Sequence, residues 1–166
     1  MQKKAFKNFI IPHVNRRFII RLIAVVAGAY IFFGHICIPT WIRGASMVPT
    51  YPERGFTFCW TPAYWFSEPE RGDIVIIRMA GKKVMLLKRV IALEGDTVSF
   101  QHGVLHVNGE AQAEPYVTHR SRDWNMQRRK VKSGHVYLIG DNRGMAMEEH
   151  TFGQTSKKRI KGMPLW

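Results

Sequence analysis

Two side chains in this sequence have the types that nucleophilic catalysis needs, a hydroxyl and an amine in apolar surroundings. Ser46 stands in the loop Gly44-Ala45-Ser46-Met47-Val48-Pro49-Thr50, which glycine and proline bracket. Lys88 stands in residues 84–91, where every other residue except Arg89 is apolar. Desolvation lowers the pKa of a lysine, and a neutral amine can take the proton of a serine hydroxyl. The alternative is a surface serine and a strand-edge lysine, and these two residues alone leave both interpretations open.

The local structure around Lys88 determines what surrounds its amine. Side chains alternate between the two faces of a strand, so a strand here places Lys88 on the face of Leu86 and Val90. Arg89 then takes the opposite face. An amine on an apolar face is desolvated, which favours its neutral form.

An apolar run near the N-terminus is long enough to cross a membrane. Residues 22–38 contain no formally charged side chain, and with its apolar flanks the run approaches the ~20 residues that span a bilayer core. A buried core helix would show a polar face. A cleaved signal peptide would have small residues after the run, where this chain has Pro39-Thr40-Trp41. The sequence therefore predicts a retained transmembrane anchor over residues 22–42.

Basic residues precede this anchor without any acidic ones. The first acidic residue is Glu53, and the basic residues are Lys3, Lys4, Lys7, Arg16, Arg17 and Arg21. The positive-inside rule then makes residues 1–21 a cytoplasmic tail and residues 43–166 an extracytoplasmic domain. The chain has 25 Lys+Arg against 12 Asp+Glu, a net charge of +13, and orientation accounts for six of the positive charges. The charge thus indicates a phospholipid membrane as a partner, and no nucleic acid is expected.

The rest of the chain alternates short β-branched runs with turn residues. The runs predict strands over residues 56–60, 73–78, 83–93, 97–100, 104–107 and 135–139. Gln101-His102-Gly103 and Asn108-Gly109 are typical of hairpin turns. Such a pattern predicts a mainly β domain, an antiparallel sandwich or barrel.

A strongly basic segment lies between these runs. Residues 120–132 hold six Lys and Arg side chains against Asp123 alone. The simpler interpretation is a solvated loop. The alternative is a contact with anionic lipid head groups or an acidic partner.

Several blocks of the chain follow one another in a familiar order. They cover nearly all of residues 40–162 and are residues 44–50, 71–75, 87–98, 104–109, 140–143, 152–153 and 160–162. In this order, behind an N-terminal anchor, they resemble the type I signal peptidases, which are serine peptidases with a Ser/Lys dyad. The resemblance implies a mainly antiparallel β fold with its active site near the membrane surface.

The same resemblance assigns roles to residues of this chain. Ser46 is implied as the nucleophile and Lys88 as the general base. Oxyanion and substrate binding are implied around Gly44, Ser46 and Met47, although some family members have a hydroxyl donor at the position of Gly44. No metal and no organic cofactor are expected.

The last block departs from the family pattern. Its turn Gly140-Asp141-Asn142-Arg143 is similar, but a serine, an aspartate and an arginine that usually follow are here Ala146, Glu148 and His150. We expect packing to orient Lys88 in place of the serine, Glu148 to keep the negative charge and His150 to replace the arginine in part. These departures indicate a specialised peptidase, and the conjugative-transfer peptidases that mature pilin subunits are a natural comparison.

The sequence therefore predicts a single-pass serine endopeptidase of the bacterial inner membrane, with a cytoplasmic N-terminus and a periplasmic or extracellular catalytic domain. Its expected substrates are exported preproteins, or a pilin-like subunit, that carry a signal sequence. The alternative is a catalytically silent, membrane-anchored binding or scaffold protein on the same fold. The presence of both Ser46 and Lys88 argues against that alternative.

Overall fold

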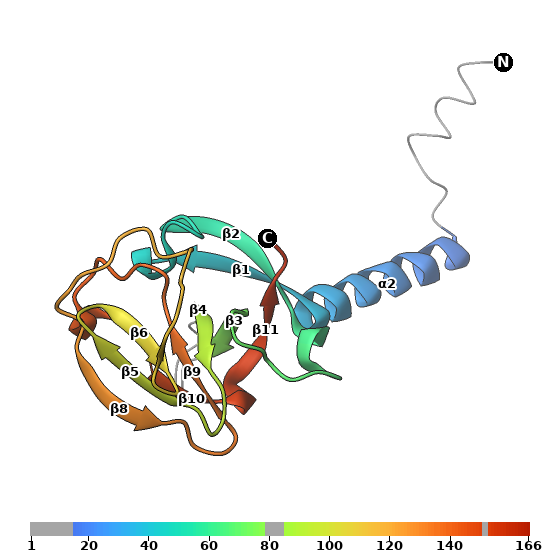
Figure 1. Ribbon diagram of the computed structural model, residues 1–166. Helices are drawn as coiled ribbons and strands as arrows, with labels where there is room; N and C mark the ends of the chain where they lie inside the picture. The colour runs from blue at the N-terminus through green and yellow to red at the C-terminus, as the bar shows by residue number, and fades with distance from the viewer. Residues whose placement is uncertain (1–14, 79–84, 151–152) are drawn as a thin grey trace.

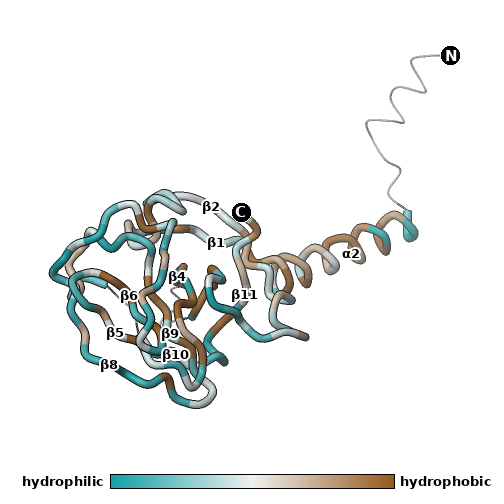
Figure 2. Tube along the Cα trace, in the orientation of Figure 1, coloured by the Kyte–Doolittle hydropathy of each residue, from teal (hydrophilic) through white to brown (hydrophobic). Residues whose placement is uncertain are grey.

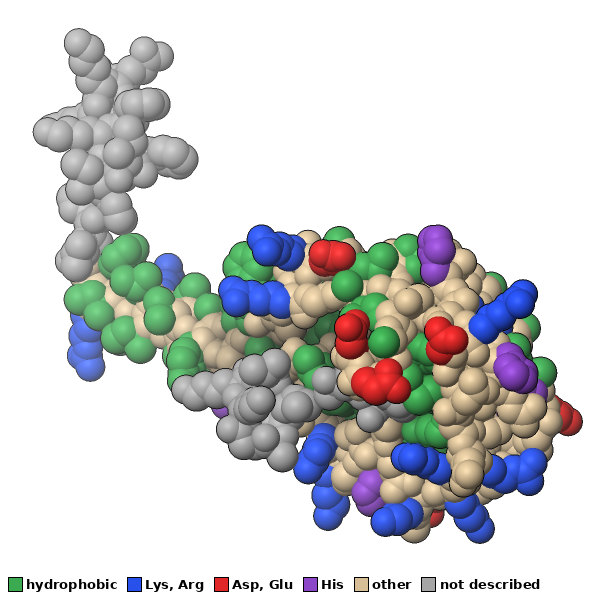
Figure 3. Space-filling model, turned by 90° about the vertical axis from the view of Figure 1, so that its left-hand side faces the viewer, with side chains coloured by type: hydrophobic (Ala, Val, Ile, Leu, Met, Phe, Trp, Pro, Cys, Tyr) green, Lys and Arg blue, Asp and Glu red, His purple; other side chains and the backbone are tan. Residues whose placement is uncertain are grey.

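The computed structural model describes residues 15–78, 85–150 and 153–166. An apolar helix projects from a β domain (Figure 1). It comprises α2 (Arg16–Ile31) and a π-helical turn, η1 (Phe32–Ile36), and the Asn15 side chain caps it by accepting from the Phe18 N–H at 2.8 Å. No residue of α2 or η1 is buried; Figure 2 shows mostly hydrophobic residues along this helix, and Figure 3 shows apolar side chains on its visible face. By length and composition, its 21 residues could cross a membrane.

The helix has different bounds from the predicted anchor. It begins at Arg16 and ends at Ile36, whereas residues 37–42, which the sequence assigned to the anchor, lie in the strand β1 (Cys37–Arg43). β1 pairs with β2 (Arg54–Trp60) in an antiparallel hairpin. Pro39 has no N–H to donate, but a proline is tolerated in an edge strand, and β1 is the outermost strand of its sheet.

The described strands of the domain form two antiparallel sheets. The larger has seven strands in the order β1-β2-β11-β3-β4-β9-β10. Its other members are β3 (Ile74–Arg78), β4 (Met85–Ala92), β9 (His135–Ile139), β10 (Gly153–Ser156) and β11 (Ile160–Pro164). Four 3₁₀ turns connect its strands: η2 (Ala45–Met47), η3 (Thr61–Tyr64), η4 (Met147–Glu149) and η5 (Lys157–Arg159). The predicted mainly β, antiparallel fold is confirmed.

The smaller sheet lies on the left of Figure 1. Its order is β7-β6-β5-β8, with β5 (Thr97–Gln101), β6 (Val104–Val107), β7 (Glu110–Ala111) and β8 (Met126–Lys130). Both predicted hairpin turns are present, and His102 and Asn108 take the positive φ values of 48° and 56° that such tight turns require. The prediction of a basic loop over residues 120–132 is wrong in part, because residues 126–130 form β8. Four of its five side chains are exposed, so no apolar alternation marks it as a strand.

Apolar side chains from both sheets form the core. Val75, Val90 and Leu138 fill one cluster of the larger sheet, and Phe100 and Trp124 belong to a cluster at the smaller sheet. The apolar stretches of the strands are visible as brown segments inside the domain in Figure 2. Burial of these side chains is the main favourable term in folding.

A buried ion pair links Glu114, in the connection after β7, to Arg143, in the turn after β9. The Arg143 guanidinium donates to both carboxylate oxygens of Glu114, at 2.7 and 3.1 Å, and both side chains are 1% exposed. The Arg143 Nε also donates to the Gly140 carbonyl at 2.8 Å, and the Tyr116 hydroxyl donates to Glu114 at 3.0 Å. The pair thus orders the turn that follows β9.

Glu114→Gln removes the negative charge from this pair and leaves a buried guanidinium without compensation. Loss of one partner of a buried pair costs ~3–5 kcal/mol. We therefore expect the melting temperature to fall by roughly 10 °C. Thermal unfolding followed by circular dichroism measures this, with Glu110→Gln on the exposed β7 as the control. Equal melting temperatures for the two variants would contradict the role of the pair.

Candidate active site

Strand β4 holds Lys88 inside the domain. Lys88 is 2% exposed and lies opposite Val75 of β3, and Val90 on its own face is fully buried. Burial lowers the pKa of the Lys88 amine to about 8, although the Asp141 carboxylate acts in the opposite direction. A substantial fraction of this amine is therefore neutral at mildly alkaline pH. The predicted desolvation of Lys88 is confirmed.

Ser46 lies at the centre of η2, directly after the tight bend at Gly44. Gly44 has a φ of 113°, which favours glycine, and its N–H donates to the Glu53 carbonyl at 2.8 Å. Met47 is 2% exposed and packs in one cluster with Ile42 and Leu87. The chain neighbours of Ser46 and Lys88 thus share an apolar cluster, and η2 contacts β4.

The turn Gly140-Asp141-Asn142-Arg143 holds the backbone of the nucleophile loop. The Asn142 N–H donates to the Ser46 carbonyl at 3.0 Å, and the Asn142 side-chain amide donates to the Ala45 carbonyl at 3.1 Å. Gly140 packs so closely that a Cβ added there would lie 2.1 Å from the Ser46 carbonyl oxygen. Only glycine fits at this contact, so the turn fixes the position of Ser46.

Asp141 joins this turn to both halves of the site. Its carboxylate is 0% exposed and accepts from Arg89 at 2.8 and 2.7 Å, in a bidentate pair. It also accepts from the Thr50 hydroxyl at 2.6 Å. Arg89 follows Lys88 in β4, and Thr50 belongs to the loop of Ser46. One buried carboxylate therefore connects the strand of the amine with the loop of the hydroxyl.

The residues after this turn differ from the expectation. Ala146 and Glu148 are exposed, and Glu148 makes no ion pair among the described residues. His150 is buried, with its ring edge-on to Trp124 at 4.8 Å. Burial, followed by repulsion from Lys88, lowers the pKa of His150 to about 4. The ring is thus neutral at neutral pH, so it does not carry the charge of the arginine that it was expected to replace in part.

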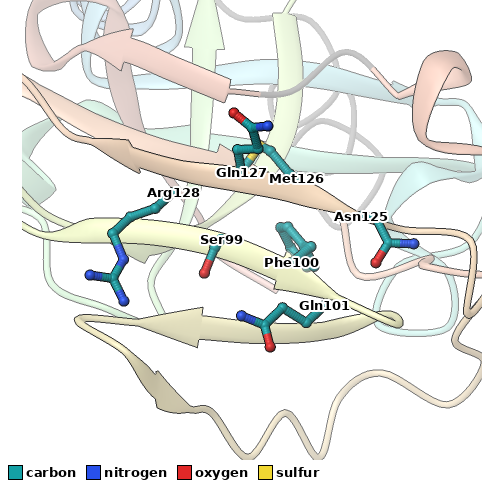
Figure 4. A pocket seen from close by; sticks show the side chains of 7 residues that line it. All are labelled: Ser99, Phe100, Gln101, Asn125, Met126, Gln127 and Arg128. Carbon is teal, nitrogen blue, oxygen red and sulfur yellow. The ribbon is translucent and has the colours of Figure 1, made fainter.

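Several hollows lie outside the immediate surroundings of Lys88. A cleft of about 820 Å³ lies between the end of β1 and the start of β2 and includes Gly44, two residues before Ser46. Figure 4 shows a smaller one, of about 330 Å³, between β5 and β8, lined by Ser99, Phe100, Gln101, Asn125, Met126, Gln127 and Arg128. None of the residues that line the smaller hollow belongs to the predicted site. Within the described ranges, no group of three His, Cys, Asp or Glu side chains could hold a metal ion.

Comparison with known proteins shows the class to which this chain belongs. The chain matches the family model "Signal peptidase, peptidase S26" over residues 15–165. It is 31% identical to signal peptidase I of Bacillus licheniformis, over 94% of this chain and 87% of that one. It is 32% identical to signal peptidase I S of Bacillus subtilis, over 85% and 81%. A solved signal peptidase I from Enterococcus faecalis aligns with a TM-score of 0.48 and 25% identity, over 58% of this chain and 97% of that chain.

The chain therefore belongs to the signal peptidase family S26. It is a serine peptidase of the kind that removes signal sequences from preproteins, as the sequence predicted.

Sequence reasoning placed Ser46, Lys88 and the turn of residues 140–143 at one site but missed how they are joined. Arg89 and Thr50 lie in the blocks that were recognised, yet nothing in their spacing indicates a shared carboxylate 52 and 91 positions away. Glu114 lies outside those blocks. A charged residue beside Lys88 in an otherwise apolar run was the only available signal for Arg89.

Gly140→Ala tests the contact between the turn and the nucleophile loop. The added methyl group would overlap the Ser46 carbonyl, which must move, so we expect a loss of activity of at least ~100-fold, as small displacements of catalytic groups produce. Gly144→Ala is the control, since its Cβ would meet its neighbours at an ordinary 3.4 Å. Hydrolysis of a preprotein by both purified variants measures the effect. Equal activity of the two would mean that this contact does not position Ser46.

Proposed function

We propose that Ser46 and Lys88 form a catalytic dyad that cleaves signal sequences from exported preproteins. The observation that carries the proposal is the buried, largely desolvated amine of Lys88 on a strand that contacts the Ser46 turn. A lysine with its ordinary pKa near ~10.4 would hold little free base at neutral pH. Burial removes this obstacle without a metal or an organic cofactor.

The reaction follows from the two groups. The Lys88 amine takes the proton of the Ser46 hydroxyl as the oxygen attacks the scissile carbonyl. Collapse of the tetrahedral adduct breaks the peptide bond, and the ammonium returns its proton to the leaving amine. An acyl-enzyme ester on Ser46 remains. Lys88, neutral again, then activates the water that hydrolyses this ester.

Backbone amides supply the oxyanion site in this proposal. The Ser46 N–H belongs to the first turn of η2, where amides have no partner inside the helical turn. In this proposal it donates to the substrate oxygen. The Gly44 N–H is occupied by the Glu53 carbonyl, so Gly44 contributes its conformation and not a hydrogen bond. Met47 contributes apolar packing below the nucleophile.

The free edge of β1 is the docking strand for the substrate. Among the described strands, β1 pairs with β2 alone, so its other edge has no strand partner. An extended peptide can add to such an edge through backbone hydrogen bonds. Its inward side chains would meet the closed cluster of Ile42, Met47 and Leu87, so small residues are favoured before the cleaved bond.

A pilin-like subunit remains the more specialised substrate within this proposal, and the exposed Ala146 and neutral His150 motivate it.

The membrane topology is part of the same proposal. The basic N-terminal end stays in the cytoplasm, the apolar helix spans the bacterial inner membrane, and the β domain, which begins with β1, lies on the extracytoplasmic side. A silent anchored scaffold is the competing function. It gives no reason for a lysine to be buried beside the nucleophile loop, because an apolar residue would pack there without a desolvation cost.

Lys88→Arg tests whether Lys88 acts as the general base in a protein that still folds. A guanidinium stays protonated and cannot accept the proton of Ser46, so activity should fall by ~10²–10⁴-fold, as for loss of a general base. Ser46→Ala should be at least as inactive. Lys130→Arg on the exposed β8 is the matched control and should keep its activity. Preprotein cleavage is the assay, with folding checked by circular dichroism. Substantial turnover by folded Lys88→Arg would overturn the dyad.

Exposed aromatic side chains after η3 test the contact with the membrane. Trp65 and Phe66 are 60% and 98% exposed, and Thr61 of η3 donates to the carbonyls of His35 and Ile36 at the end of the apolar helix. Trp65→Ala with Phe66→Ala should therefore reduce liposome binding several-fold in a chain lacking residues 1–36, since apolar rings favour the interface. His119→Ala, an exposed ring before β8, is the control. Unchanged liposome binding would remove these two residues from the membrane surface.

A further inference from the structure

Two arginines of like charge face each other beside the nucleophile loop. Arg43, the last residue of β1, is directly opposite Arg54, the first residue of β2. Like charges in such a cross-strand pair destabilise a sheet. Among the described residues, neither arginine forms an ion pair with a carboxylate. The fold therefore gains nothing from this pair, and both guanidinium groups are exposed.

The two arginines line the cleft of about 820 Å³ that reaches Gly44. Glu53 lines the same cleft without pairing with either of them, so the cleft keeps a positive charge. Gly44 and Ala45 are the only residues between Arg43 and Ser46. An anionic group that binds in this cleft thus lies close to the bond that is cut.

The alternation of β1 determines which part of a substrate Arg43 can reach. Thr40 and Ile42 face the core, while Trp41 and Arg43 face outward. In a peptide added to the free edge of β1, side chains alternate in the same way, and opposed side chains on neighbouring strands have Cβ atoms ~4.5–5.5 Å apart. If the residue before the cleaved bond, P1, faces the apolar cluster, then P2 faces outward on the side of Arg43. The long Arg43 side chain easily covers this separation.

We propose that Arg43, assisted by the field of Arg54, forms a subsite that selects preproteins with an aspartate or glutamate at P2. The inference rests on the proposed function, because it needs the substrate to dock on β1. An acidic P2 side chain would form an ion pair with Arg43, which has no carboxylate partner among the described residues. This ion pair would also reduce the repulsion between the two arginines. Inward positions P1 and P3 reject a carboxylate, since the cluster beneath them offers no partner.

A peptide series tests the subsite with the full-length protein in detergent micelles. Each peptide carries one Asp, or the isosteric Asn, at one position from P4 to P2′, and the ratio of kcat/KM for Asp over Asn is compared along the series. At low salt we expect this ratio to be ~2–5 at P2, the strength of an exposed ion pair, and below 1 at P1 and P3. The P2 ratio should decline as salt is added. Arg43→Gln should bring the P2 ratio to about 1 and Arg54→Gln should lower it in part, while the remote Arg128→Gln leaves it unchanged.

The outcomes separate this inference from the proposed function. If the wild-type protein fails to cleave the Asn peptides, or if Ser46→Ala cleaves them, the proposed function is wrong and the subsite falls with it. If the Asn peptides are cleaved but the P2 ratio is 1, or keeps its value in Arg43→Gln, only the subsite is wrong. Binding to phosphatidylglycerol vesicles is measured in parallel. Vesicle binding that weakens in Arg43→Gln, with an unchanged P2 ratio, would assign the arginines to lipid phosphates and overturn the proposal.

Discussion

The buried carboxylate of Asp141 is the interaction on which the site depends. A carboxylate withdrawn from water is costly unless other groups satisfy its oxygens. Here Arg89 donates hydrogen bonds to both oxygens, and the Thr50 hydroxyl donates to one of them. These partners come from strand β4 and from the loop of Ser46, so the chain satisfies Asp141 only when the two are side by side. Burial of the Asp141 carboxylate thus requires that β4 and the loop of Ser46 lie side by side.

The same carboxylate sets a limit on the chemistry of Lys88. A bare carboxylate near the amine would hold the ammonium form and raise its pKa. Arg89 opposes that attraction, because its guanidinium pairs with Asp141 directly. Burial then prevails, and the pKa of Lys88 falls to about 8. The neighbouring arginine, on the opposite face of the strand, therefore helps to keep the lysine available as a base.

Periodicity and turn chemistry were sufficient for much of the fold. β6 and β9 have the predicted bounds, and both hairpin turns follow from Gly103 and Gly109 after residues that tolerate positive φ. Five strands, β1, β7, β8, β10 and β11, were not predicted from local pattern, and β1 and β8 show why. β1 continues an apolar run from the helix, and only its pairing with β2 ends the helix at Ile36. β8 carries charges on successive residues, and only its pairing with β5 makes it a strand.

Part of the candidate site could likewise be predicted from the sequence, and part could not. Ser46 and Lys88 could be found from residue type and surroundings, and the resemblance of whole blocks added the turn of residues 140–143. What could not be predicted is how segments far apart in the sequence contact each other: Gly140 against the Ser46 carbonyl, or Glu114 under Arg143. Nor could the neutral state of His150 be predicted, because it depends on burial against Trp124. Sequence identifies reactive groups here, whereas their protonation is a property of the packed domain.

The pH dependence of kcat/KM for a substrate without titratable side chains tests the central claim, that a buried neutral Lys88 is the base. Only the neutral amine works, so activity should rise tenfold per pH unit at low pH and level off above a pKa of about 8. His150, with its pKa of about 4, titrates below this window. Retained circular dichroism across the range shows that folding is not what changes. A profile that keeps rising toward the ordinary lysine value of ~10.4 would contradict the account, as would a flat one down to pH ~6.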